Sequence, residues 1–181
     1  MELLALSAVL AVMPAFSLGL HTHLVFDSDN LGPGSFFKEC PLGEVVSKVY
    51  SEHDNDGEDR IPHIDCRPAP LGWNPETCSW TNGFENDWDK PLSYTCPTNW
   101  ALAGVASLFS NNYDDRIFRF QCCEFKGLKT SECEMTDYLN DWEGVLDYTA
   151  PNGTVIAGWF SEHMDGYEDR RHKLLECLFS E

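Results

Sequence analysis

The stretch Ser51-Glu-His-Asp-Asn-Asp-Gly-Glu-Asp-Arg60 returns twice in the chain, as Ser107-Leu-Phe-Ser-Asn-Asn-Tyr-Asp-Asp-Arg116 and as Ser161-Glu-His-Met-Asp-Gly-Tyr-Glu-Asp-Arg170. The three copies align without a gap, and they follow one another at intervals of 56 and 54 residues. Self-similarity at a fixed period of this length marks a repeated supersecondary unit. The sequence therefore predicts a body made from three copies of one unit.

The similarity extends upstream of these stretches. Val45-Val46, Ala101-Leu102 and Val155-Ile156 occupy matching positions, and Asn86-Asp-Trp88 matches Asn140-Asp-Trp142. We place the units at about residues 20–67, 78–123 and 133–177, inside a single domain of residues 20–181. Short linkers rich in Pro, Gly or polar residues separate them.

Each unit reads as three strands. The second strand is Glu44–His53 or its equivalent, and a polar Asp/Asn/Gly loop makes the tight reversal that such residues favour. The third strand follows Asp-Arg, as in Ile117–Cys122. Helical periodicity is weak throughout. The predicted fold is all-β, with a pseudo-threefold β-prism or trefoil-like arrangement of three units.

The N-terminus and the charge indicate an extracellular protein. Residues 1–19 read as a signal peptide, with an apolar run from Leu3 to Phe16 and small residues near the cut, and no later segment could cross a bilayer. Thirty Asp and Glu against twelve Lys and Arg give a net charge of −18. This charge argues against nucleic acid as a partner, because nucleic acid requires a basic surface.

Eight cysteines behind a signal peptide predict a disulfide framework, and the repeat alignment selects the pairs. Cysteines at matching positions give two bridges that each span 26 residues and two that span 45 and 44 residues. The predicted bridges are Cys40–Cys66, Cys96–Cys122, Cys78–Cys123 and Cys133–Cys177. Ala150 stands where the third unit would carry the cysteine equivalent to Cys40 and Cys96, so the third unit is expected to lack a bridge of the 26-residue kind.

Asp115-Arg-Ile-Phe-Arg-Phe-Gln-Cys-Cys123 resembles the Asp-Arg-x-Trp-x-aromatic-x-Cys-Cys signature of the dermatopontin family. The resemblance implies a secreted, non-enzymatic protein. The divergence from the signature and the strong acidity suggest an invertebrate-type member, and the invertebrate relatives include agglutinins, shell-matrix proteins and a cytotoxin. The vertebrate members associate with collagen and proteoglycans. The signature Trp is replaced by Phe118, Pro62 and His172 in the second, first and third copies.

The Asp-Arg pairs have two interpretations. In the structural one, which we favour, Asp caps the turn and Arg packs its stem while pairing with a carboxylate. In the functional one, three symmetry-related loops present Arg to sulfated or sialylated glycans, because its planar fork binds anions bidentately. The ligand-binding candidates are then Asp59, Arg60, Asp115, Arg116, Asp169 and Arg170.

Metal and catalytic patterns are weak. The acidic loops 54–59 and 165–169 do not follow EF-hand spacing, so at most weak Ca²⁺ binding is expected and no cofactor. His53 and His163 match, but Phe109 holds the middle copy, which argues against a symmetric metal site. No catalytic constellation is present, and the predicted bridges leave no thiol nucleophile, so we do not expect an enzyme.

Other residues point to surface recognition and modification. Trp88 and Trp142 are candidates for stacking on sugar, and Asn152 begins the single glycosylation sequon. Tyr113 and Tyr167 lie among acids and are sulfation candidates. We expect an extracellular matrix or adhesion protein that recognises glycans, proteoglycans or collagen-like polymers. A defence or venom-type agglutinin or cytotoxin is the alternative, and homo-oligomerisation stays open.

Overall fold

A computed structural model describes residues 34–70, 75 and 77–180, so the predicted signal peptide and its cut lie outside the described residues. All elements in this part of the chain are strands, which confirms the all-β prediction. The strands are β1 (Ser35–Glu39), β2 (Glu44–Ser51), β3 (His53–Asp54), β4 (Asp59–Arg60), β5 (His63–Pro68), β6 (Thr77–Trp80), β7 (Leu92–Thr95), β8 (Trp100–Ser110), β9 (Asp115–Glu124), β10 (Lys129–Met135), β11 (Leu146–Thr149), β12 (Thr154–Met164) and β13 (Asp169–Ser180).

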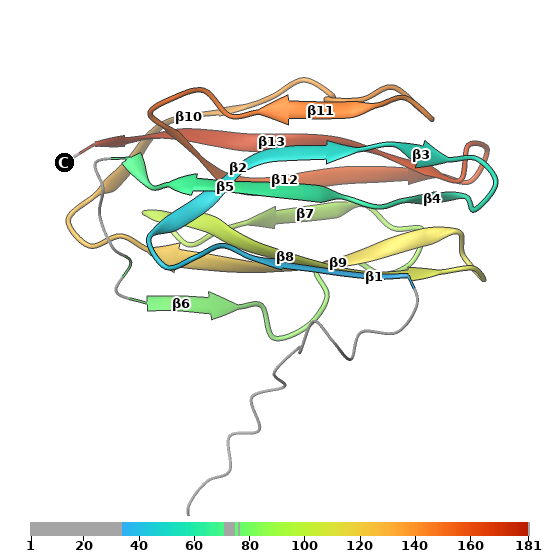
Figure 1. Cartoon of the computed structure of the whole chain (residues 1–181), viewed down its shortest axis with the longest axis horizontal. Coiled ribbons are helices and arrows are strands. Elements are labelled where there is room, and N and C mark those ends of the chain that lie inside the picture. Colours follow the sequence, from blue (N-terminus) through green and yellow to red (C-terminus); the bar gives the residue numbers. More distant parts are fainter. Residues whose placement is uncertain (1–33, 71–74, 76, 181) are drawn as a thin grey trace, which may run out of the picture.

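Three antiparallel hairpins form the framework, and their tips lie at the same end of the molecule, at the right in Figure 1. The first hairpin is β2–β5 with β3–β4 at its tip, the second is β8–β9 and the third is β12–β13. Each tip is one of the polar reversals predicted from the repeat. The residue before each Asp-Arg pair has a positive φ, at 48° for Glu58, 43° for Asp114 and 44° for Glu168.

The strand that precedes each hairpin does not pair with that hairpin. Instead β1 pairs with β8 of the second hairpin, β7 with β12 of the third, and β11 with β2 of the first. The units thus exchange strands in a closed cycle, whereas the sequence had predicted three-stranded units. The prism or trefoil-like description of the whole body stays a prediction.

A bulge at the same place in each hairpin receives the exchanged strand. The register shifts between Val46 and Lys48, between Leu102 and Gly104, and between Ile156 and Gly158. A bulge leaves one residue out of the ladder. The carbonyls of these bulged residues, Ser47, Ala103 and Ala157, accept the N–H groups of Ala150, Cys40 and Cys96 respectively, at 2.8–2.9 Å.

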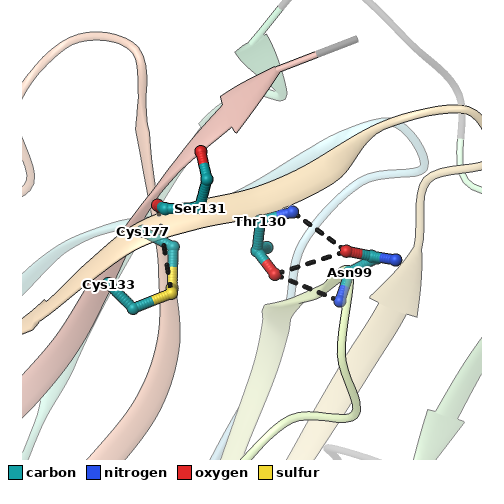
Figure 2. The surroundings of a disulfide bond; sticks show 5 residues. All are labelled: Asn99, Thr130, Ser131, Cys133 and Cys177. Carbon is teal, nitrogen blue, oxygen red and sulfur yellow. Dashed lines mark hydrogen bonds between the residues drawn. A yellow bond between two sulfur atoms is a disulfide. The ribbon is translucent and has the colours of Figure 1, made fainter.

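Two further strands extend the second and third hairpins at their outer edges. Strand β6 pairs with β9 and β10 with β13. Cys78–Cys123 and Cys133–Cys177 lie within these pairs, and Figure 2 shows the second bridge. Near the bridge Thr130 and Asn99 exchange hydrogen bonds of 3.0 and 3.2 Å, which fix the start of β10 (Figure 2).

The other two disulfides join the end of an exchanged strand to the hairpin that follows it in sequence. Cys40 lies just after β1 and is bonded to Cys66 of β5, and Cys96 lies just after β7 and is bonded to Cys122 of β9. All four pairs are those that the repeat alignment gives. Because each of these bridges links two neighbouring hairpins of the cycle, they hold the exchange closed.

The largest apolar core lies where the three hairpins meet. Val49, Val105 and Trp159 occupy equivalent positions on β2, β8 and β12, and each is at most 1% exposed. Phe118 and Phe120 of β9 stack beside Trp159 with ring centroids 6.2 and 5.8 Å away. The cycle therefore closes around a shared aromatic centre, to which every unit contributes.

Candidate functional site

The three Asp-Arg pairs form a closed ring at the base of the hairpin tips. Each guanidinium binds the carboxylate of another copy through Nε and Nη2. Arg60 donates to Asp169 at 2.8 and 3.0 Å, Arg116 to Asp59 at 2.6 and 2.7 Å, and Arg170 to Asp115 at 2.6 and 2.7 Å. Bidentate pairs of this kind are the strongest hydrogen bonds between side chains.

Further bonds fix each member of the ring. The Nη1 of every arginine donates to the serine that opens its own copy of the repeat: Ser51, Ser107 or Ser161. Backbone N–H groups of Asp89 and Glu143 donate to Asp115 and Asp169, both at 2.8 Å. The arginines are 3–6% exposed, so their donors are directed at the protein itself rather than at solvent.

The ring keeps the carboxylate of Asp169 charged in spite of burial. Burial alone would raise the pKa of Asp169, but the hydrogen bonds and charge of Arg60, together with the N–H groups of Glu143 and Arg170, bring the pKa below its ordinary value. A carboxylate that accepts several hydrogen bonds is stabilised in its ionised form. The geometry supports the structural interpretation of the Asp-Arg pairs.

Below the ring, the residues that replace the signature Trp lie against the core. The Nε1 of Trp159 donates to Nδ1 of His172 at 2.9 Å, so this ring nitrogen is unprotonated. Burial, and then the charges of Arg60 and Arg170, lower the pKa of His172 to about 3, against a smaller opposing effect of Asp169. The imidazole is therefore neutral in the folded protein.

We predict that His172 makes the fold sensitive to acid. Its pKa is lower in the folded than in the unfolded chain, so the unfolded state binds the extra proton between pH 6.5 and pH 3, and stability falls across that window as the pH is lowered. Between pH 7 and pH 5 the loss is about 2 kcal/mol. His172→Phe, which copies Phe118 of the second unit, should remove this part of the pH dependence in urea unfolding.

His63→Gln serves as the control, because the side chain of His63 is 69% exposed. That variant should keep the full pH dependence. If the free energy of unfolding changed with pH by the same amount in the wild type and in His172→Phe, the assignment of this pH dependence to His172 would be contradicted, whatever the absolute stability of the variant.

The hairpin tips and the ring surround a small hollow that is partly open to solvent. Glu58, Asp114 and Glu168 line it, one from each tip, with Phe109 and His163. Burial raises the pKa of Glu168, and the nearby carboxylates of Asp114, Asp165 and Glu58 raise it further, against the opposing effect of His163. The mouth of the hollow is thus strongly acidic.

Two stacked aromatic pairs flank the tips. The rings of Trp88 and Tyr113 are parallel within 2° at 5.4 Å, and those of Trp142 and Tyr167 are parallel within 4° at 5.5 Å. The tyrosines are 46% and 41% exposed. The sequence singles out all four residues but not their pairing; the signal was the equal spacing of Trp and Tyr in both units. Gly57 stands at the tyrosine position of the first unit.

The third-unit pair continues into a row of alternating cations and rings. The guanidinium of Arg171 lies 4.5 Å from the Trp142 ring centre and 4.0 Å from that of Tyr138. Lys173 lies 4.3 Å from the Tyr138 ring centre, and Glu162 accepts a 2.6 Å bond from Arg171. These contacts hold Trp142 in place.

The asparagine of each Asn-Asp-Trp motif is structural. Asn86 and Asn140 are buried, and each bonds the backbone two residues apart on the adjoining strand: Asn86 donates to the Arg116 carbonyl and accepts from the Phe118 N–H, and Asn140 does the same with Arg170 and His172. These bonds replace a strand ladder at that point. They therefore position Trp88 and Trp142 beside the tips.

The sequon at Asn152 lies in the turn between β11 and β12. Asn152 is exposed, and Thr154 closes the turn by donating through N and Oγ1 to the Pro151 carbonyl. Of the other tryptophans named in the sequence, Trp73 lies outside the described residues. Among the described residues, the structure offers no helix with the length and apolar character that a bilayer crossing requires.

Comparison with known proteins identifies the family. The dermatopontin family model matches residues 32–180. The hemagglutinin/amebocyte aggregation factor of Limulus polyphemus is 34% identical over 168 residues, which is 91% of this chain and 95% of the relative. Dermatopontin of Biomphalaria glabrata is 36% identical over 148 residues, with 82% and 97% covered.

Millepora cytotoxin-1 of Millepora dichotoma is 34% identical over 142 residues, which cover 78% of this chain and 62% of the relative. No solved structure matches the chain. The family match spans all of the described residues, and the resemblance read from Asp115–Cys123 is confirmed. The chain belongs to the dermatopontin family.

Proposed function

We propose that the protein is a secreted, non-enzymatic adhesion protein that binds glycans of the matrix or the cell surface through the two Tyr–Trp pairs at its hairpin tips. The observation that carries this proposal is the geometry of Tyr113 and Tyr167. Each ring rests flat on a tryptophan and keeps nearly half of its surface exposed. Rigid aromatic rings supply contact area with little loss of conformational entropy.

Charge selects the class of glycan. The tips carry Glu58, Asp114 and Glu168 around the hollow, and the chain as a whole has a net charge of −18. A sulfated or sialylated chain would meet like charge there, since the ring arginines already bind carboxylates. We therefore propose that neutral glycans bind the exposed faces of Tyr113 and Tyr167, which we call the tyrosine platforms, and that the Asp-Arg pairs have a structural role.

The relatives support an adhesion role and keep a second candidate open. One is named a hemagglutinin and aggregation factor, two are named dermatopontin or cytotoxin, and all match most of this chain. An agglutinin needs two or more binding sites on one particle. The two Tyr–Trp pairs, on different hairpins, meet that requirement within one chain.

The proposal is tested on a glycan array that carries neutral, sulfated and sialylated glycans. The expected result is binding to neutral glycans that weakens at least about tenfold, or about 1.4 kcal/mol, in Tyr167→Ala and in Tyr113→Ala. Leu42→Ala is the control, because Leu42 is 78% exposed on a turn that contributes to neither pair. Binding that is unchanged in the double tyrosine variant would refute the platforms, and a blank array would move the proposal to collagen-like or proteoglycan core partners.

Two cell-level assays separate the two candidate functions. Agglutination of red cells that a simple neutral sugar inhibits would support an adhesion or agglutinin role. Leakage of dye from lipid vesicles without a glycan would support the cytotoxin role instead. The tyrosine variants should lose the first activity and would leave the second unchanged.

Two modifications belong to the same proposal. Asn152 is proposed to carry an N-linked glycan, because its turn is exposed and lies at the start of β12, the end opposite to the hairpin tip. Sulfation of Tyr113 and Tyr167 is proposed as a way to change the platforms from neutral to anionic. The intact mass of the secreted protein, before and after glycosidase treatment, reports both modifications.

A further inference from the structure

We propose that Asp89, Asp115 and His163 form a binding site for one divalent transition-metal ion, of the class of Zn²⁺, at the edge of the hollow between the second and third hairpins. One ligand atom from each residue lies within 4.8 Å of the others. Among the described residues, this is the one group of histidine, cysteine and carboxylate side chains that comes together in this way. The three residues come from the β6–β7 connection, β9 and β12.

His163 is the observation that points to a ligand. Its side chain is 1% exposed, and neither ring nitrogen has a hydrogen-bond partner. The buried Oδ1 of Asp89 is also without a partner, and it lies 3.8 Å from Nδ1 of His163. Buried polar atoms left unpaired are costly and call for an ion or water between them.

The distances suit coordination rather than direct pairing. Two ligands of a tetrahedral Zn²⁺, each about 2.0–2.2 Å from the ion, stand about 3.3–3.6 Å apart. Nδ1 of His163 lies 3.8 Å from Asp89 and 3.5 Å from Oδ1 of Asp165, which is exposed and can complete the shell. For an ion to bridge Nδ1 of His163 and Oδ1 of Asp89, these two atoms would need to approach by only a few tenths of an ångström, and the ligand atom of Asp115 lies within 4.8 Å of both side chains' ligand atoms.

The second nitrogen of the imidazole faces a carboxylate, which is the kind of group to which metal-bound histidines usually donate that N–H. Nε2 of His163 faces Oε2 of Glu168 at 3.8 Å. A carboxylate on that side favours the tautomer with the proton on Nε2 and leaves Nδ1 free for the ion. The site would then consist of a nitrogen ligand, its supporting carboxylate and two or three carboxylate ligands.

The ring arginine does not prevent this arrangement. Asp115 Oδ1 accepts one bond, from Nε of Arg170, and so keeps a lone pair. Asp89, Asp115 and Asp165 bring three negative charges against the single charge of Arg170, which leaves two for a divalent ion. A histidine in the shell selects a transition metal over Ca²⁺, which prefers six to eight oxygen ligands.

The repeat supplies a matched control. His53 is the counterpart of His163 in the first unit, but Nε2 of His53 already bonds Glu58 at 3.3 Å, and Asn55 and Glu143 stand at the positions of Asp165 and Asp89. Phe109 fills the third position. The three copies therefore differ at this position, and among the described residues the third copy is the one that brings a histidine and two carboxylates within reach of one ion.

The test is isothermal titration calorimetry of Zn²⁺ into the untagged, secreted protein. Zn²⁺ binding is expected to weaken at least about tenfold in His163→Phe and in Asp89→Asn, and to persist in His53→Phe and in excess Ca²⁺. Phe109 shows that the tip accepts phenylalanine, and Asn tolerates the positive φ of 59° at Asp89. The two variants therefore do not depend on the same local change.

Circular dichroism first establishes that each variant is folded. Absence of Zn²⁺ binding up to about 1 mM in the wild type would overturn the proposal. Equal affinity in the wild type and both site variants would also overturn it, because the ion would then lie elsewhere. Failure of this proposal would not affect the proposal of glycan binding by the tyrosine platforms, because neither His163→Phe nor Asp89→Asn alters Tyr113 or Tyr167.

Discussion

Replacing Asp115 with asparagine is expected to lower the free energy of unfolding by about 3–5 kcal/mol. Asparagine has the same shape but no charge. The guanidinium of Arg170, 3% exposed, would keep its place without a counter-charge. Removing one partner of a buried ion pair costs more than the pair itself contributes, because the other charge stays desolvated.

The ring makes the same prediction three times. Asp59→Asn and Asp169→Asn remove the counter-charges of Arg116 and Arg60, so both should fall in the same range in guanidinium unfolding with the disulfides intact. Asp56→Asn, on the exposed tip of the first hairpin, should change stability by less than about 0.5 kcal/mol. A loss below about 1 kcal/mol for Asp115→Asn would show that the ring contributes little.

The second large effect is a gain. Ala150→Cys together with Glu176→Cys should form a fifth disulfide and stabilise the fold by about 3 kcal/mol, since the bridge would close a loop as long as those of Cys40–Cys66 and Cys96–Cys122. In the repeat, Ala150 is equivalent to Cys40 and Cys96, and Glu176 is equivalent to Cys66 and Cys122. The Ala150 N–H bonds the bulged Ser47 carbonyl just as Cys40 and Cys96 bond theirs.

The native side chains at this place are a poor substitute for a bridge. Oε1 of Glu176 is buried without a hydrogen-bond partner. Burial raises the pKa of Tyr148 well above its ordinary range, and the hydrogen bond and the charge of Glu176 raise it further. The variant should lose the mass of two hydrogens and unfold at a higher temperature. Ala150→Ser with Glu176→Ser is the control without a bond, and a bridged protein no more stable than this control would refute the prediction.

Arg67 already stabilises the contact between the first hairpin and the β11–β12 turn in another way. It stands at the position that Cys123 and Cys177 hold in the other two units, and it donates to the carbonyls of Ala150, Pro151 and Thr154. The first unit thus uses a charged side chain where the others use sulfur. This contact lies beside the engineered bridge and should remain in the variant.

The sequence predicts the local structure and the cysteine pairing but not the partners of the exchanged strands. A repeat aligns equivalent residues, so it identifies Cys40 with Cys96 and the hairpin of one unit with that of the next. It does not say whether β1 returns to its own hairpin or to another, because the same half-buried strand fits the same edge in all three copies. The bulge carbonyl that receives each strand becomes visible only in the structure.

The Asp-Arg ring shows a similar limit. Successive side chains on a strand point to opposite faces, so Asp59 and Arg60 cannot pair with each other, and each must find its partner elsewhere. With three identical motifs, several pairings satisfy this rule. The distances among Arg60, Asp169 and their counterparts select one direction around the cycle.

The closed exchange has a consequence for the order of synthesis. Strand β2 lacks its neighbour β11 until most of the chain has been made. Arg60 has no carboxylate partner until Asp169, which lies 109 residues later in the sequence, has been synthesised. At about 5–20 residues per second, the first hairpin stays incomplete for roughly 5–20 s. During that interval the first hairpin exposes an open strand edge and an unpaired cation to its surroundings. Chaperone capture of nascent chains should therefore peak before the third unit emerges.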